Sequence, residues 1–175
     1  MATTTEVPLD VYLHTSYHPD REWVAGELKE RNVGNRPHSI VQKFFMKFFL
    51  ALEKEHHLLV YSELRTQVAA SSYRIPDVLV LRDDDPFTAI VHTPPLLCIQ
   101  ILSPDDRMAD LWEKIEDYSA MGVKAVWVVD PQRRRAFVLE DGALLPADRL
   151  TLPGTPITAR TDEIFAELDR LEGRV

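Results

Sequence analysis

Three polar residues interrupt stretches that are otherwise apolar, and together they could serve the hydrolysis of a phosphodiester bond. Asp77 lies within the strand-like segment 73–82, YRIPDVLVLR. Gln100 lies within the apolar run 96–104, LLCIQILSP, and Lys114 falls on the apolar stripe of the helix-like segment that follows. Carboxylates on neighbouring strands can hold one or two Mg²⁺ ions, which polarise the phosphate and lower the pKa of an attacking water. A lysine near that water would orient it and stabilise the developing negative charge.

Each of these residues also has an ordinary structural interpretation. An aspartate in a strand usually stands at an edge or an end, and a buried glutamine is usually hydrogen-bonded to its neighbours in the core. A lysine on an apolar stripe usually extends its amine into solvent. Here an acid, an amide and a lysine occur in order on two adjacent central strands and the helix after them. That order favours one shared site over three unrelated placements.

Composition limits the class of protein. The 175 residues suit a single domain, 1–175, with one sizeable core. No apolar run reaches the length of a membrane helix, and the N-terminal sequence MATTTEVPLD has no secretory signal. The single cysteine, Cys98, excludes an intrachain disulfide, and zinc-site spacings are absent. We therefore expect a cytoplasmic protein with no membrane partner, and we expect no organic cofactor.

The charge of the chain counts against a nucleic-acid partner without excluding one. The net charge is −8 and the pI about 5.2, whereas phosphate contacts need clustered lysine and arginine. An acidic enzyme can still carry a local basic patch. The densest basic run, PQRRR at 131–135, is interpreted most simply as a solvated turn between two strands.

The order of predicted elements indicates an α/β (α+β) domain with a central mixed β-sheet flanked by helices and an N-terminal hairpin. Periodicity and turn residues predict a hairpin whose turn is Ala25-Gly26, and a proline-rich loop before the last helix. We expect Ser103 or Asp105 to cap the middle helix, Gly122 to end it, and Thr161 to cap the last. The predicted elements are the hairpin 20–32, helices 37–57, 103–122 and 161–171, and strands 58–69, 73–82, 95–103, 123–130 and 135–141.

Several stretches resemble the Uma-two family of "putative restriction endonucleases", whose core is the PD-(D/E)xK nuclease fold. They are VAGELKE near the start, the helix beginning at His38, RIPDVLVL, IQILSP, and LWEKIEDYSAMGVKAVWVVDP. The last stretch resembles the family's K…Y…GV..YW.VDP signature, and the resemblance spans nearly the whole chain. It implies a restriction-endonuclease-like core and an endonuclease that cuts DNA with Mg²⁺ or Mn²⁺.

The resemblance assigns roles to the residues that interrupt the pattern. Asp77 matches the aspartate of the family's PD. Gln100 stands where the family usually has glutamate. The wider nuclease fold has a lysine two residues later, but this chain has Leu102 there, so Lys114 from the next helix would supply the amine. The metal ligands implied are Asp77, Gln100 and Glu27.

Glu27, in the AGEL hairpin, matches an early acidic residue of the family that would be an additional metal ligand. If the register of the hairpin is shifted, Glu22 or Glu30 would take this role instead.

Two functions follow from a glutamine at position 100. The amide keeps one carbonyl oxygen and loses a negative charge, which should weaken the binding of a hard cation. The protein is then either a metal-dependent endonuclease, or a nuclease-derived domain that binds nucleic acid or a protein partner without cutting. Because cutting both strands needs two sites, an endonuclease of this size would act most simply as a homodimer.

Overall fold

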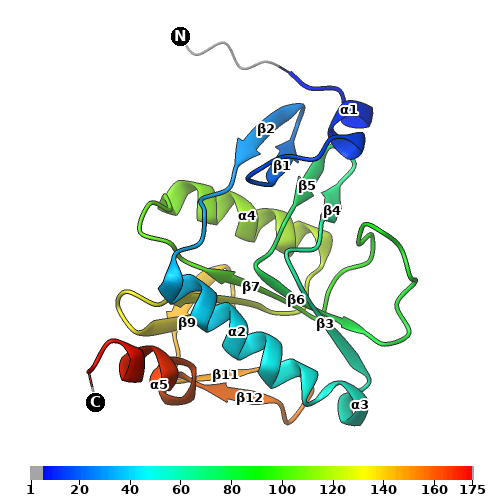
Figure 1. Cartoon of the computed structure of the whole chain (residues 1–175). Helices are drawn as coiled ribbons and strands as arrows, with labels where there is room; N and C mark the ends of the chain where they lie inside the picture. The colour runs from blue at the N-terminus through cyan, green and yellow to red at the C-terminus, as the bar shows by residue number, and fades with distance from the viewer. Residues whose placement is uncertain (1–5, 175) are drawn as a thin grey trace.

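A six-stranded mixed sheet forms the centre of the structure, a computed structural model that describes residues 6–174 (Figure 1). The strand order is β10-β9-β8-β7-β6-β3. Only β7 and β8 pair in parallel; the other neighbours are antiparallel. The strands are β3 Leu58–Ser62, β6 Val78–Arg82, β7 Leu97–Ile101, β8 Val126–Asp130, β9 Arg135–Glu140 and β10 Ala143–Pro146.

A second sheet of four short strands stands beside the first. Its order is β2-β1-β5-β4, with β1 Arg21–Val24, β2 Glu27–Glu30, β4 Thr66–Ala69 and β5 Ser72–Arg74. The predicted hairpin is β1–β2. Its turn residues Ala25 and Gly26 have φ of 50° and 92°, the left-handed backbone that two-residue hairpin turns require. A third sheet pairs β11 Arg149–Thr151 with β12 Thr158–Arg160.

Helices cover both faces of the six-stranded sheet (Figure 1). α2 and α5 pack on one face, and α4 packs on the other. The helices are α1 Leu9–His14, α2 Arg36–Leu50, α3 Glu53–His56, α4 Met108–Met121 and α5 Thr161–Leu171. None of those in the described part of the chain combines the length and apolar character needed to cross a bilayer.

Strand periodicity decides which side chains face α4. On β6, Val78 and Val80 belong to the core under α2, whereas Leu79 belongs to the core under α4. On β7, Cys98 belongs to the α4 core as well. Since alternate residues of a strand share a face, Gln100 is directed toward α4. These placements confirm the predicted fold class, a mixed sheet flanked by helices.

Two predicted strands each divide into a pair. Segment 73–82 forms β5 and β6, which belong to different sheets, and Asp77 lies in the junction between them. Pro76 contributes to the break because it has no backbone N–H for a sheet ladder. Segment 58–69 divides into β3 and β4 near Glu63, whose φ is 52°.

The helix boundaries also differ from expectation in part. The first long helix breaks after Leu50, and α3 follows as a separate turn. α4 starts at Met108, because Ser103 and Asp106 form a turn of their own: Ser103 N donates to Asp106 Oδ2 at 2.6 Å. Neither Ser103 nor Asp105 caps it, although Gly122 ends it with a φ of 93°.

The last helix and the segment before it need two smaller corrections. α5 has the predicted bounds, but Thr161 is not its cap: its hydroxyl donates to the Asp148 carbonyl. The proline-rich loop contains β10, β11 and β12.

Candidate active site

Asp77 lies at the point where the chain leaves the small sheet and enters the large one. Its carboxylate is buried, and both of its oxygens have partners. Oδ1 accepts a hydrogen bond from Arg31 Nη2 at 2.9 Å and lies 3.4 Å from His38 Nε2. Oδ2 accepts from the backbone N–H of Ile101 at 2.7 Å. This last bond joins Asp77 directly to β7, the strand that carries Gln100.

These partners keep Asp77 ionised. Burial alone raises the pKa of the Asp77 carboxyl, because a charge is poorly solvated in the interior. The hydrogen bond and charge of His38, the charge of Arg31 and the N–H of Ile101 outweigh burial and hold that pKa below its ordinary value. Asp77 is therefore a carboxylate at neutral pH.

Gln100 is buried on β7 with its side chain directed at α4. Its Nε2 donates to the hydroxyl of Tyr118 at 2.8 Å. Burial raises the pKa of the Tyr118 phenol well above its ordinary value, so Tyr118 remains neutral. The Gln100 carbonyl oxygen accepts no hydrogen bond from residues 6–174. Gln100 is thus only half satisfied by its neighbours, and its oxygen remains available for a ligand.

Lys114, on α4, is held by a buried carboxylate. Its Nζ lies 3.3 Å from Glu22 Oε1, and Glu22 is only 1% exposed. Glu22 also accepts hydrogen bonds from Arg74 Nη1 at 3.1 Å and from the Ile75 backbone N–H at 3.0 Å. Arg74 in turn donates to Asp117 at 2.6 Å. Lys114 therefore does not extend freely into solvent.

Asp77, Gln100 and Lys114 line one polar cavity of about 30 Å³, together with Arg31 and His38. This volume accommodates about one water or ion. A neighbouring hollow of about 40 Å³ shares Gln100, Asp106 and Lys114 with it and extends to the start of α4. The structure therefore brings three of the four sequence-predicted site residues together.

Glu27 is the residue that the structure does not bring to this cavity. It pairs with Val24 beside the hairpin turn, is partly exposed, and lines neither hollow. Glu22, the alternative considered from the sequence, is the hairpin carboxylate that contacts Lys114. Arg31 and His38, whose side-chain nitrogens face Asp77, were not identified as site residues from the sequence.

The oxygens at the cavity meet the simplest requirement of Mg²⁺, which is often held by one or two carboxylates while waters and substrate phosphates fill the other positions. Asp77 supplies a charged oxygen and Gln100 a neutral one. Within residues 6–174 there is no group of three or more His, Cys, Asp or Glu side chains placed to hold an ion. A carboxylate and an amide are oxygen ligands of the kind that Mg²⁺ or Mn²⁺ takes, but Arg31 already pairs with the Asp77 carboxylate and would compete with an ion for it.

A solved structure that aligns with nearly the whole chain supports this fold. A crystal structure of "a putative nuclease belonging to DUF820" from Anabaena variabilis ATCC 29413 matches with a TM-score of 0.80 and 19% identity, covering 93% of this chain and 99% of that one. A cryo-EM structure of a DrdV–DNA complex has a TM-score of 0.40 and 11% identity, covering 77% of this chain and 13% of that one. None of the curated proteins compared with the chain matches it.

The family itself is shown by a match along most of the sequence. The family model named Uma2, "Putative restriction endonuclease", matches residues 11–160. This span contains every residue of the cavity described above. The chain therefore belongs to the Uma2 family.

Proposed function

We propose that this protein is a nuclease that hydrolyses phosphodiester bonds of DNA with the help of Mg²⁺ or Mn²⁺. The observation that carries the proposal is the convergence of Asp77, Gln100 and Lys114 on one polar cavity in a chain of this family. The three residues come from a strand junction, a strand and a helix. Their convergence matches the combination of oxygen ligands and amine that phosphodiester hydrolysis needs.

Asp77 and Gln100 would hold the metal ion through a carboxylate oxygen and the amide oxygen. When bound, such an ion polarises the phosphate and lowers the pKa of an attacking water. Lys114 would place its positive charge beside the phosphate and stabilise the negative charge that develops there. Glu22 keeps the Lys114 amine at the cavity, because the two form an ion pair in the interior.

Arg31 would change partners in this proposal. In the structure its guanidinium pairs with Asp77 and, at 3.5 Å, with Glu63. A guanidinium can also bind a phosphate with two parallel hydrogen bonds. When a DNA phosphate enters, Arg31 would exchange Asp77 for the phosphate, leaving the carboxylate to the metal ion.

A second function is favoured by the charges at the cavity, namely binding of nucleic acid without cutting. Position 100 carries no charge, Arg31 already compensates Asp77, and His38 Nε2 lies 3.4 Å from the same carboxylate oxygen. The affinity for nucleic acid would then come from basic residues. In the basic run 131–135, however, two of the arginines already form ion pairs with acidic residues of this chain. Arg134 pairs with Asp169 and Glu172, both at 2.6 Å, and Arg133 pairs with Asp130 at 3.0 Å.

A plasmid assay separates the two functions. Supercoiled DNA is incubated with Mg²⁺, with Mn²⁺ or with chelator, and nicked and linear products are measured over time. The natural protein should nick DNA only with metal, and Asp77→Asn should abolish nicking while retaining the fold by circular dichroism. Glu140→Gln, at an exposed position on β9, is the matched acid-to-amide control and should nick like the parent. A parent that shifts DNA in a gel without metal, and never nicks it, supports the binding function.

We further propose that the active form is a homodimer, since two sites related by two-fold symmetry can cut both strands. Analytical ultracentrifugation of the protein with and without duplex DNA tests this. The expected result is a dimer whose plasmid product includes linear DNA at early times. A protein that remains monomeric with DNA and yields only nicked circles contradicts the dimer.

A further inference from the structure

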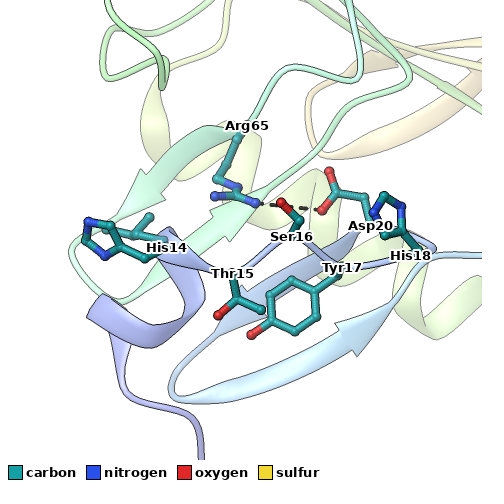
Figure 2. Close-up of a pocket in the computed structure, with 8 residues that line it drawn as sticks. His14, Thr15, Ser16, Tyr17, His18, Asp20 and Arg65 are labelled. Atoms are coloured by element: carbon teal, nitrogen blue, oxygen red, sulfur yellow. Dashed lines mark ion pairs between the residues drawn. The ribbon is translucent and has the colours of Figure 1, made fainter.

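A larger hollow lies away from the cavity that holds Asp77. It has a volume of about 460 Å³ and lies between the end of α1 and the loop that connects β3 with β4 (Figure 2). Its polar lining comes from the segment 14–18, Asp20 and Arg65. It has no lining residue in common with the Asp77 cavity, so it can be tested separately.

Arg65 is the cation of this pocket, and its hydrogen-bonding capacity is unused. Its side chain is only 19% exposed, yet none of its nitrogens donates a hydrogen bond to any residue in the range 6–174. Nε is buried without a partner. The ion pair with Asp20 drawn in Figure 2 spans 3.7 Å between Nη2 and Oδ1, which is too long for a hydrogen bond. A guanidinium has five N–H donors, and buried donors normally find acceptors.

The guanidinium packs against an aromatic ring although it donates no hydrogen bond within residues 6–174. It stacks on the ring of Tyr12 with 4.3 Å between its central carbon and the ring centroid. Tyr12 is itself buried against Trp23 and Tyr73, and its hydroxyl donates to the Arg21 carbonyl at 2.9 Å. Because the aromatic cluster fixes the orientation of Arg65, little side-chain freedom would be lost when an acceptor binds.

We propose that this pocket binds the phosphate group of a ligand the size of a nucleoside monophosphate. The planar fork of an arginine matches two oxygens of a phosphate, and the hydroxyl of Ser16 lines the same pocket. The volume lies in the range typical of small organic ligands and is larger than a phosphate alone requires. The ring of Tyr17 lines the pocket as well. It already packs against the ring of Tyr12 and the guanidinium of Arg21, so a base would contact only the part of the ring that they leave uncovered.

Asp20 defines which phosphate compounds fit. Its carboxylate repels a phosphate, but it can accept a hydrogen bond from a sugar hydroxyl. Oδ1 also accepts from the Arg21 backbone N–H at 2.9 Å, so an asparagine can replace Asp20 and keep that bond. The same phosphate chemistry is present in a free nucleotide and at the 5′ end of a nucleic-acid strand. The proposal does not depend on the nuclease function.

Isothermal titration calorimetry with defined probes tests the proposal. The probes are adenosine monophosphate, adenosine, inorganic phosphate and one oligonucleotide with or without a 5′ phosphate. Adenosine monophosphate should bind and adenosine should not. Arg65→Gln should weaken the binding of the nucleotide about 10- to 100-fold, the range for charge-assisted hydrogen bonds. Arg149→Gln, at an exposed position on β11, should leave it unchanged.

Asp20→Asn provides a variant that should gain affinity. Removal of the repelling charge should tighten phosphate binding severalfold. If Arg65→Gln fails to fold, the affinity of the folded Asp20→Asn variant still tests the proposal. One outcome is that only the 5′-phosphorylated oligonucleotide binds and that Arg65→Gln weakens this binding. That result assigns the site to strand ends and still supports a phosphate pocket. Failure of every phosphate probe to bind, or binding that neither substitution changes, overturns the proposal.

Discussion

The Lys114 amine lies 3.3 Å from the carboxylate of Glu22, which joins the N-terminal hairpin to the helix that follows β7. Glu22 is almost completely buried, accepts hydrogen bonds from Arg74 and the Ile75 N–H, and forms an ion pair with Lys114. The carboxylate matters most for Lys114, because Arg74 also pairs with Asp117, whereas Glu22 is the one ion-pair partner of Lys114 within residues 6–174. The position of Lys114 at the cavity therefore depends on a residue from a different sheet.

Glu22→Gln tests this dependence. The substitution leaves Arg74 and Lys114 without their shared anionic partner, so the free energy of unfolding should fall by about 3 kcal/mol, the lower end for a broken buried pair. Plasmid nicking should fall as well, because the Lys114 amine is no longer held. Urea denaturation measures the stability. Glu27→Gln is the matched control and should change stability by less than about 0.5 kcal/mol. If Glu22→Gln and Glu27→Gln lose the same stability and the same nicking activity, Glu22 does not position Lys114.

The pH dependence of stability should report the ionisation of Asp77. Its pKa in the folded state lies below the ordinary value of 3.8. A carboxyl with a lowered pKa contributes stability that is present above the unfolded-state value and is lost as pH falls through the folded-state value. Asp77→Asn should therefore be less stable than the parent at pH 7, and the difference should narrow below about pH 4. Urea midpoints from pH 7 to pH 2.5 measure it. A constant difference at every pH contradicts the assignment.

The sequence was sufficient to mark Asp77 and Gln100 as polar residues of one site. Strand periodicity puts alternate residues on one face, which places Gln100 toward α4. Asp77 lies in the junction between β5 and β6, and its carboxylate meets Arg31, His38 and the Ile101 N–H instead. Lys114 follows from helical spacing in the same way, since Leu111, Ile115 and Tyr118 mark the buried side of α4. Local periodicity therefore gave most of the candidate site.

The choice between Glu22 and Glu27 could not be made from local periodicity. In the hairpin Val24 pairs with Glu27, and Glu22 is two residues from Val24, so the two carboxylates share a face. Which end of the hairpin meets α4 depends on the pairing of β1 with β5, where Trp23 is opposite Tyr73. That contact joins segments about 50 residues apart, so no local pattern encodes it. The same reason applies to Arg31, whose partner Asp77 is remote in sequence.

Arg31→Gln should alter metal binding and DNA binding in opposite directions. The variant frees an Asp77 oxygen from its guanidinium partner, so Mn²⁺ should stabilise the variant more than the parent, because an ion that binds only the folded state raises its stability by mass action. DNA affinity should fall, since a phosphate contact is removed. Thermal melts across a Mn²⁺ titration and gel shifts at low salt measure the two effects. Arg149→Gln is the control for loss of one positive charge. A Mn²⁺ response equal to that of the parent would show that Arg31 does not compete with the ion.

Gln100→Glu should convert a weak metal site into a stronger one. The new carboxylate would lie at the same cavity as Asp77, and two close carboxylates repel each other without metal. The neutral Tyr118 hydroxyl, 2.8 Å from the present amide nitrogen, can donate to the new carboxylate and so keep that hydrogen bond.

The variant should therefore be less stable than the parent in chelator, by about 1–3 kcal/mol, and gain more stability from Mg²⁺ or Mn²⁺. Nicking should appear or increase over the same range of metal concentration. Thermal melts with and without metal measure the first effect, with Gln132→Glu in the exposed β8–β9 turn as the control for an added charge. If Gln100→Glu responds to metal no more than the parent does, position 100 is not a metal ligand. Gln100 would then serve the core through its hydrogen bond to Tyr118, and the binding function without cutting would be favoured.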